Sequence, residues 1–237
     1  MISLQDCREG SADQHVRILH LVRHGQASFH AEDYDQLSPL GAEQARALGV
    51  QLAARGVPID ALYSGPRRRQ LDTARHLRDA ARANGAQLPE PTQLDALDEV
   101  PFREILNANL QRTGVRPRDK REAVQLLQGA LLAWAQGELP DAGCESFDAF
   151  AQRIDGALAV LTQHAPGHIV AVTSAGPIAL ALRHARAPGT ATPSATMKIA
   201  ASLGNASVTR FLHDGAGLTL QVANDVDHLS DALRSYV

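Results

Sequence analysis

The chain has 237 residues, of which 44% are hydrophobic, and a formal net charge of −3 at pH 7. This length is enough to bury a sizeable core, and the slightly acidic balance excludes the basic surface that nucleic-acid-binding proteins usually carry. No stretch approaches the roughly 18 apolar residues of a membrane span, and two cysteines make no disulfide framework. We therefore expect a cytoplasmic protein that binds neither nucleic acid nor membrane.

The first half of the chain alternates short apolar runs with helical patterns. Ser38 and Pro39 provide an N-cap and a first-turn proline for a helix, and Gly56 provides its stop. Residues 1–15 are polar and predict a loosely ordered lead-in without the apolar segment of a signal peptide. The elements expected in this half are a strand at 17–22, a helix from 39 to 56, a strand at 60–63, a helix from 67 to about 83 and one short strand within 86–101.

The second half begins with helical patterns and ends with strands. A helical hairpin carries an apolar stripe at Val124, Leu127, Leu131 and Trp134, whereas the stretch around Met197 gives no clear pattern. The further elements expected are a helix at 147–161, a strand at 168–173, a helix at 178–184 and a β-hairpin formed by 206–213 and 217–223. This order predicts an α/β fold, a three-layer α/β/α sandwich with a mainly parallel central sheet, and a single domain over residues 16–237.

Three expected strand ends carry residues suited to phosphate chemistry. They are Arg23-His24-Gly25, the stretch from Ser64 to Arg69, and Ser174-Ala175-Gly176. Ligands of open α/β sheets bind outside the carboxyl ends of the strands, and the free N–H groups of helix N-termini attract anions. Arginine matches phosphate geometry with two parallel hydrogen bonds, and a histidine nitrogen can attack phosphorus. A glycine after the histidine permits close approach of the backbone to a ligand.

Two motifs resemble those of the histidine phosphatase superfamily, the phosphoglycerate-mutase-like proteins. The first is LVRHG at 21–25, and the second is YSGPRRRQLDTA at 63–74. Within the second motif, Arg69 lies four residues before Thr73, which is the family's spacing for its second phosphate-binding arginine. The resemblance covers roughly residues 17–229 and implies a phosphoglycerate-mutase-like fold. Two weaker similarities are Glu145-Ser146 at the start of a helix and Asn224-Asp225 followed by His228-Leu229.

The resemblance also implies roles for individual residues. His24 would be the nucleophile that becomes phosphohistidine, and Arg23 and Arg69 would neutralise the phosphoryl oxygens. Glu99 would protonate the leaving oxygen, with the adjacent Asp98 as the alternative acid. The family needs no metal and no cofactor, so we expect neither.

One position departs from the family pattern. Ser174 stands where the family has its second histidine, which places the chain with a serine-containing subgroup. Ser28, Ser174 and Ala175 would then contact phosphate as uncharged groups. His228 is a candidate substitute cation if the C-terminal tail folds over the site.

The sequence therefore favours a metal-independent phosphomonoester phosphatase whose partner is a small phosphorylated metabolite. The alternative is a phosphate-binding pseudoenzyme with little turnover, because Ser174 brings no charge. A mutase is less favoured, since the segment at 100–145 is shorter than the insertion that mutases of the family usually carry. A serine hydrolase using Ser174 lacks the first glycine of the Gly-x-Ser-x-Gly turn. Neither the substrate nor the oligomeric state can be predicted from the sequence.

Overall fold

The structure is a computed structural model that describes residues 16–28, 35–139, 143–163, 167–186, 192–215 and 217–236. Its strands are β1 (Arg17–Arg23), β2 (Ile59–Ser64), β3 (Thr92–Gln93), β4 (Gly167–Thr173), β5 (Val208–His213) and β6 (Leu218–Asp225). Its α-helices are α1 (Pro39–Arg55), α2 (Arg68–Ala83), α3 (Phe102–Thr113), α4 (Lys120–Ala135), α5 (Phe147–Thr162), α6 (Ala175–Arg186) and α7 (Pro193–Ser202). The expected lead-in at 1–15 lies outside the described residues, and the single domain from residue 16 stays a prediction.

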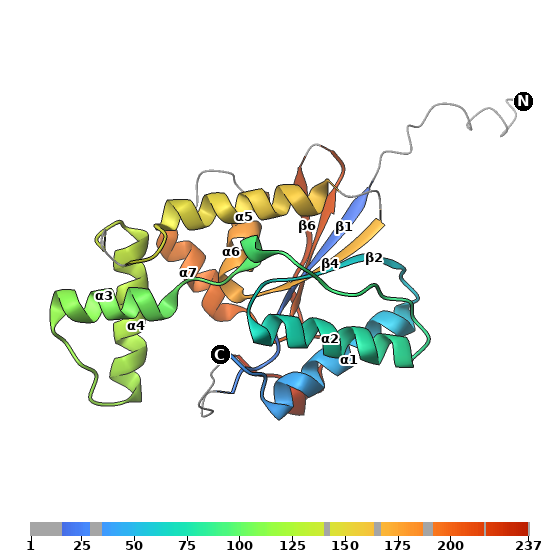
Figure 1. Cartoon of the computed structure of the whole chain (residues 1–237), viewed down its shortest axis with the longest axis horizontal. Helices are drawn as coiled ribbons and strands as arrows, with labels where there is room; N and C mark the ends of the chain where they lie inside the picture. The colour runs from blue at the N-terminus through green and yellow to red at the C-terminus, as the bar shows by residue number, and fades with distance from the viewer. Residues whose placement is uncertain are drawn as a thin grey trace, which may run out of the picture.

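The six strands form one mixed sheet in the order β3-β2-β4-β1-β5-β6. The pairs β2–β3, β2–β4 and β1–β4 are parallel, and β5 runs antiparallel to both β1 and β6. Helices α1 and α2 cover one face of this sheet, and α5, α6 and α7 cover the other (Figure 1). The expected three-layer sandwich with a mainly parallel sheet is confirmed, because only β5 opposes the direction of the other strands.

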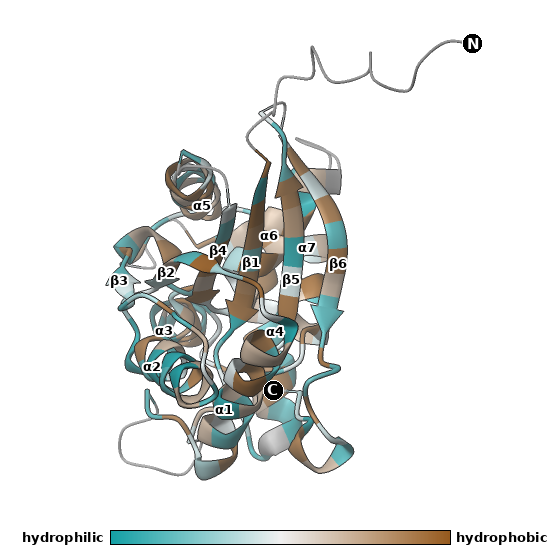
Figure 2. Ribbon diagram, turned by 90° about the vertical axis from the view of Figure 1, so that its right-hand side faces the viewer, coloured by the Kyte–Doolittle hydropathy of each residue, from teal (hydrophilic) through white to brown (hydrophobic). Residues whose placement is uncertain are grey.

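Each face of the sheet has its own core because successive side chains of a strand point to opposite faces. From β1, Leu19 and Leu21 pack in the larger core beneath α5 and α6, whereas Val22 packs with Leu48 of α1 and Leu77 of α2. Figure 2 shows the hydrophobic stretches of β1 in brown between the helices, and α2 as mostly hydrophilic. The polar helices thus pack through a narrow apolar stripe, which fixes their position over the strand ends.

Most of the expected elements are confirmed, with two differences. Helix α7 was not predicted, although Thr192 caps its N-terminus and Pro193 occupies its first turn, the same signal that begins α1. In α4, Val124 is 48% exposed, so the apolar stripe facing the core is shorter than predicted. No helix in the described part of the chain is both long enough and apolar enough to span a bilayer.

The start of α1 packs directly against the turn that follows β1. A methyl group on Gly25 would lie 2.3 Å from the carbonyl oxygen of Gly41, and one on Gly41 would lie 2.2 Å from that of Gln26. The glycine after the histidine therefore serves the approach of α1 to this turn, in addition to the expected approach of a ligand. Ser38 caps the helix through its Oγ, which accepts a hydrogen bond from Gly41 N.

We predict that Gly41→Ala lowers the free energy of unfolding by about 1–3 kcal/mol, because the added methyl group meets backbone rather than a movable side chain. The matched control is Gly129→Ala in α4, where an added methyl group has no neighbour within 4 Å. This control should be neutral or stabilising by up to about 1 kcal/mol, since alanine is the better helix former. Denaturant unfolding of both variants measures the difference, and equal effects would contradict the close packing.

Candidate active site

Three strand ends meet at the carboxyl edge of the sheet. His24 N, just past β1, donates to Thr173 O at the end of β4, at 2.9 Å. Gly65 N, just past β2, donates to Val172 O, also at 2.9 Å. Because β4 lies between β1 and β2, the turns after all three strands are neighbours. The expectation that these strand ends converge is confirmed.

His24 is buried and held in one tautomer. Its Nδ1 lies 2.7 Å from the carbonyl oxygen of Gly25, and a carbonyl can only accept, so Nδ1 carries the hydrogen. The opposite nitrogen, Nε2, has the lone pair and accepts a hydrogen bond from Arg69 Nε at 3.0 Å. Burial, followed by the charges of Arg69 and Arg23, holds the pKa of His24 well below its usual value. The imidazole is therefore neutral near pH 7, with a nucleophilic Nε2.

Arg69 reaches His24 from the first turn of α2. Thr73, one turn further along α2, accepts a hydrogen bond from Gly25 N at 3.0 Å and donates to Arg69 O at 2.7 Å. The threonine thus joins the start of α2 to the turn after β1. This contact gives a physical reason for the spacing of arginine and threonine in the second motif.

Asp35 is a site residue that the sequence reasoning missed. Its Oδ1 lies 2.6 Å from Arg69 Nη1, and its Oδ2 accepts a hydrogen bond from Arg68 N at 2.8 Å. One carboxylate thus binds both a guanidinium and the N-terminus of α2, as an anionic ligand would. No local signal identifies it, because its partners lie more than 30 residues away in the sequence.

Arg23 is the second cation beside His24. Its side chain is only 8% exposed, and its Nη1 donates to Leu203 O at 2.5 Å. Its backbone N donates to Ser207 O at 3.0 Å, so the segment before β5 supports the strand end that carries the arginine. The structure therefore brings both sequence-predicted arginines to His24.

Glu99 is 5% exposed and lies close to the start of α6. Its Oε1 accepts hydrogen bonds from Val100 N at 2.8 Å and from Gly176 N at 3.2 Å. A methyl group on Gly176 would lie 2.5 Å from this oxygen, so the close approach requires glycine there. Burial raises the pKa of Glu99, although the two hydrogen bonds and the charges of Arg69 and Arg23 oppose this shift.

Asp98, the alternative acid, is engaged elsewhere. Its Oδ1 lies 2.5 Å from Arg67 Nε and accepts a hydrogen bond from Glu99 N at 2.7 Å. Arg67 is accordingly part of an ion pair. The two neighbouring carboxylates thus have different surroundings, one buried near two arginines and one paired with Arg67.

Ser174 is fully buried, and its hydroxyl is bound by a second residue that the sequence reasoning missed. Gln70 Nε2 donates to Ser174 Oγ at 2.8 Å, and Gln70 Oε1 accepts from Arg67 N at 3.0 Å. The hydroxyl hydrogen of Ser174 can still be donated to a ligand. Ala175 begins α6 directly after Ser174 and is also buried. The sequence offered one signal for Gln70 as a site residue, because it directly follows Arg69 on the first turn of α2.

The remaining two predicted residues lie at the margins of this arrangement. Ser28 N donates to Gln36 O at 2.8 Å beside the bridge between Ala27 and Leu37, so it lies in the turn that leads away from His24. His228 is partly buried, and burial lowers its pKa to about 4. It is therefore neutral near pH 7, and this does not support the expectation that it supplies a positive charge.

The arrangement fits nucleophilic attack on the central atom of an oxyanion, such as the phosphorus of a phosphoryl group. It combines a neutral imidazole whose Nε2 lone pair faces Arg69, two guanidinium groups and a carboxyl group of raised pKa. The guanidinium groups can neutralise developing negative charge, and the carboxyl group can deliver a proton. Within the described residues, no group of three or more His, Cys, Asp or Glu side chains is arranged to hold a metal ion.

We predict that Asp35→Asn increases the affinity for inorganic phosphate by about tenfold, because an incoming anion then no longer competes with a carboxylate for Arg69. The matched control is Asp72→Asn, which removes the same charge from α2 where Asp72 pairs only with Arg68 and Arg75. Isothermal titration with phosphate measures both variants. A weaker affinity in Asp35→Asn would instead show that Asp35 positions Arg69 for the ligand.

The fold is similar to that of several solved structures. A phosphoglycerate mutase from Bacillus anthracis is 20% identical with a TM-score of 0.64, and 91% of this chain and 96% of that chain are covered. A phosphoserine phosphatase from Entamoeba histolytica is 21% identical with a TM-score of 0.62, over 90% and 100%. A mycobacterial glucosyl-3-phosphoglycerate phosphatase is 24% identical with a TM-score of 0.59, over 90% and 100%.

This structural similarity establishes the fold. The family is established by a comparison of the whole sequence with a family model. No curated protein matches the chain. The family model of the histidine phosphatase superfamily, branch 1, matches residues 19–226, a range that begins within β1 and ends just past β6. Because this match spans most of the chain and includes both motifs, the chain belongs to the histidine phosphatase superfamily.

Proposed function

We propose that this chain is a phosphomonoester phosphatase that acts through a phosphohistidine on His24 and requires no metal. The observation that carries the proposal is the tautomer of His24. The Gly25 carbonyl holds the hydrogen on Nδ1, so the lone pair is on Nε2, the nitrogen that faces Arg69. A neutral nucleophile beside two buried cations suits a substrate that arrives as an anion.

In the first step, the phosphoryl oxygens of the substrate replace Asp35 as the partner of Arg69, and Arg23 binds from the other side. His24 Nε2 then attacks phosphorus while the bond from phosphorus to the leaving oxygen breaks. Glu99 donates its proton to that oxygen, and the alcohol departs. In the second step Glu99 takes a proton from water, the oxygen of which attacks phosphorus and releases His24 as neutral imidazole together with inorganic phosphate.

We assign the acid role to Glu99 rather than Asp98 because of their surroundings. A general acid that works near neutral pH needs a raised pKa, and burial provides this for Glu99. Asp98 is instead engaged in an ion pair with Arg67, with 2.5 Å between its Oδ1 and Arg67 Nε. Arg67 and Asp98 then serve to fix the segment that carries Glu99.

Ser174 defines the serine-containing subgroup to which we assign the chain. A hydroxyl in the place of a cation donates one hydrogen bond to a phosphoryl oxygen, and Gln70 fixes its orientation. Loss of one preorganised donor costs about 10²–10³ in rate, so we expect turnover to be slower than in relatives with a second histidine. A phosphate-binding protein without turnover is the competing function, and a mutase is less favoured than either.

The substrate class is a small phosphorylated metabolite. Solved structures of similar fold include a phosphoserine phosphatase bound to phosphoserine or 3-phosphoglyceric acid, and a glucosyl-3-phosphoglycerate phosphatase bound to inorganic phosphate. Phosphoserine and 3-phosphoglyceric acid each carry one phosphate group on a small remainder. We propose a cytoplasmic location, in keeping with a sequence that contains only two cysteines.

We predict that the wild-type chain, mixed with p-nitrophenyl phosphate and quenched in base, carries one additional phosphate on His24, because the phosphohistidine bond survives base. Mass spectrometry of the intact chain and of its peptides measures the label. His24→Asn should carry none, and its phosphatase rate provides the blank. A wild-type chain that binds phosphate but never labels or hydrolyses the ester at any pH would identify the non-catalytic alternative.

We predict that Glu99→Gln lowers kcat by about 10²–10⁴ for an alkyl ester such as glycerol phosphate, and much less for p-nitrophenyl phosphate, the leaving group of which needs no proton. The wild-type rate on the alkyl ester should fall as the pH rises through the pKa of Glu99, and this limb should be absent in Glu99→Gln. Asp98→Asn is the matched comparison. If Asp98→Asn showed the larger dependence on the leaving group, Asp98 would be the acid.

A further inference from the structure

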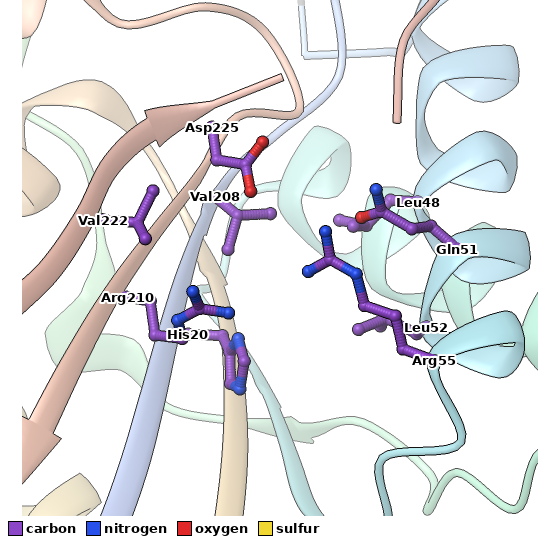
Figure 3. A pocket seen from close by; sticks show the side chains of 9 residues that line it. All are labelled: His20, Leu48, Gln51, Leu52, Arg55, Val208, Arg210, Val222 and Asp225. Atoms are coloured by element: carbon purple, nitrogen blue, oxygen red, sulfur yellow. The ribbon is translucent and has the colours of Figure 1, made fainter. Parts of the chain in front are cut away.

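A cavity lined by both polar and apolar residues lies between α1 and the strands β1, β5 and β6 (Figure 3). The space between its lining residues is about 290 Å³, a figure that includes open solvent. His20, which belongs to β1, forms part of its wall. It precedes His24 by four residues, which corresponds to about 13 Å along an extended chain. None of the residues His24, Arg69 and Glu99 lines this cavity. The cavity is therefore distinct from the site described above.

Two arginines from different elements face this cavity. Arg55 is the last residue of α1 and extends toward the sheet, and Arg210 extends from β5 beside His20 (Figure 3). Among the described residues, neither guanidinium group forms an ion pair or a side-chain hydrogen bond. Arginine stays charged at all accessible pH values, so both groups keep their donors available to a ligand.

With the remaining polar groups of the wall included, the lining residues carry a net positive charge. Asp225 is the only carboxylate among the lining residues, and its Oδ1 already accepts a hydrogen bond from Asp227 N at 2.9 Å. His20 is neutral, because burial, His168, Arg210 and Arg55 lower its pKa to about 3.

We propose that this cavity binds a small oxyanion, the phosphate or carboxylate group of a metabolite, between the guanidinium groups of Arg55 and Arg210. Two guanidinium groups can each give paired hydrogen bonds to such an anion, and the side-chain amide of Gln51 adds a neutral donor. The proposal does not depend on catalysis at His24.

Isothermal titration of the full chain with inorganic phosphate tests this site, with malonate as a second probe that carries carboxylates only. We expect two phosphate-binding events in the wild type. Arg55→Gln and Arg210→Gln should each weaken one event by about tenfold or more. Asp225→Asn should strengthen the same event, because it removes the only carboxylate that faces the anion. Binding of malonate with the same variant pattern would extend the class to carboxylates.

Two control variants separate the sites. Arg46→Gln removes an exposed guanidinium of α1 that pairs with Glu43, and it should leave both events unchanged. Arg69→Gln should abolish the event at His24 and leave the one at Arg55. A single binding event that Arg69→Gln removes and Arg55→Gln leaves intact would overturn the proposal. The imidazole NMR signals of His20 give a second readout, since they should shift with phosphate in the wild type and not in Arg210→Gln.

Discussion

The hydrogen bond between His24 Nδ1 and the carbonyl oxygen of Gly25 is the interaction on which the site depends. It fixes the tautomer of a buried imidazole and so decides which nitrogen has the lone pair. The same glycine donates its N–H to Thr73 and lies against the backbone of Gly41. One residue without a side chain therefore sets the orientation of His24 and joins β1, α1 and α2 around it.

The charges beside His24 are buried, and their burial has a thermodynamic cost. Arg23, Arg69 and Glu99 are each less than a tenth exposed. Charged groups lose solvation in such surroundings, and the loss is offset only where other groups bind them. Here Asp35 binds Arg69, the Leu203 carbonyl binds Arg23, and two backbone N–H groups bind Glu99. These contacts hold the three side chains in place around His24.

Most residues of the candidate site could be predicted from the sequence, because the motifs that mark them are local. The motif at 21–25 and the motif at 63–74 each place a functional side chain at the end of a strand, and the sheet brings such ends together. Helix α1 was predicted from an N-cap, a first-turn proline and a glycine stop, which depend only on neighbouring residues. The same kind of signal at Thr192-Pro193 marks α7, but the short segment gave no clear periodic pattern.

The sequence by itself determined the fold class and the family, and its motifs marked His24, Arg23 and Arg69 as the candidate nucleophile and phosphate-binding arginines, since these signals are carried by short motifs and apolar periodicity. Only the tertiary structure decided which neighbours these residues have. The contacts Asp35–Arg69, Gln70–Ser174 and Arg67–Asp98 join residues between 31 and 104 positions apart. Burial likewise depends on the packing of several elements, so the pKa shifts of His24 and Glu99 and the charge state of His228 could not be predicted before the elements were assembled.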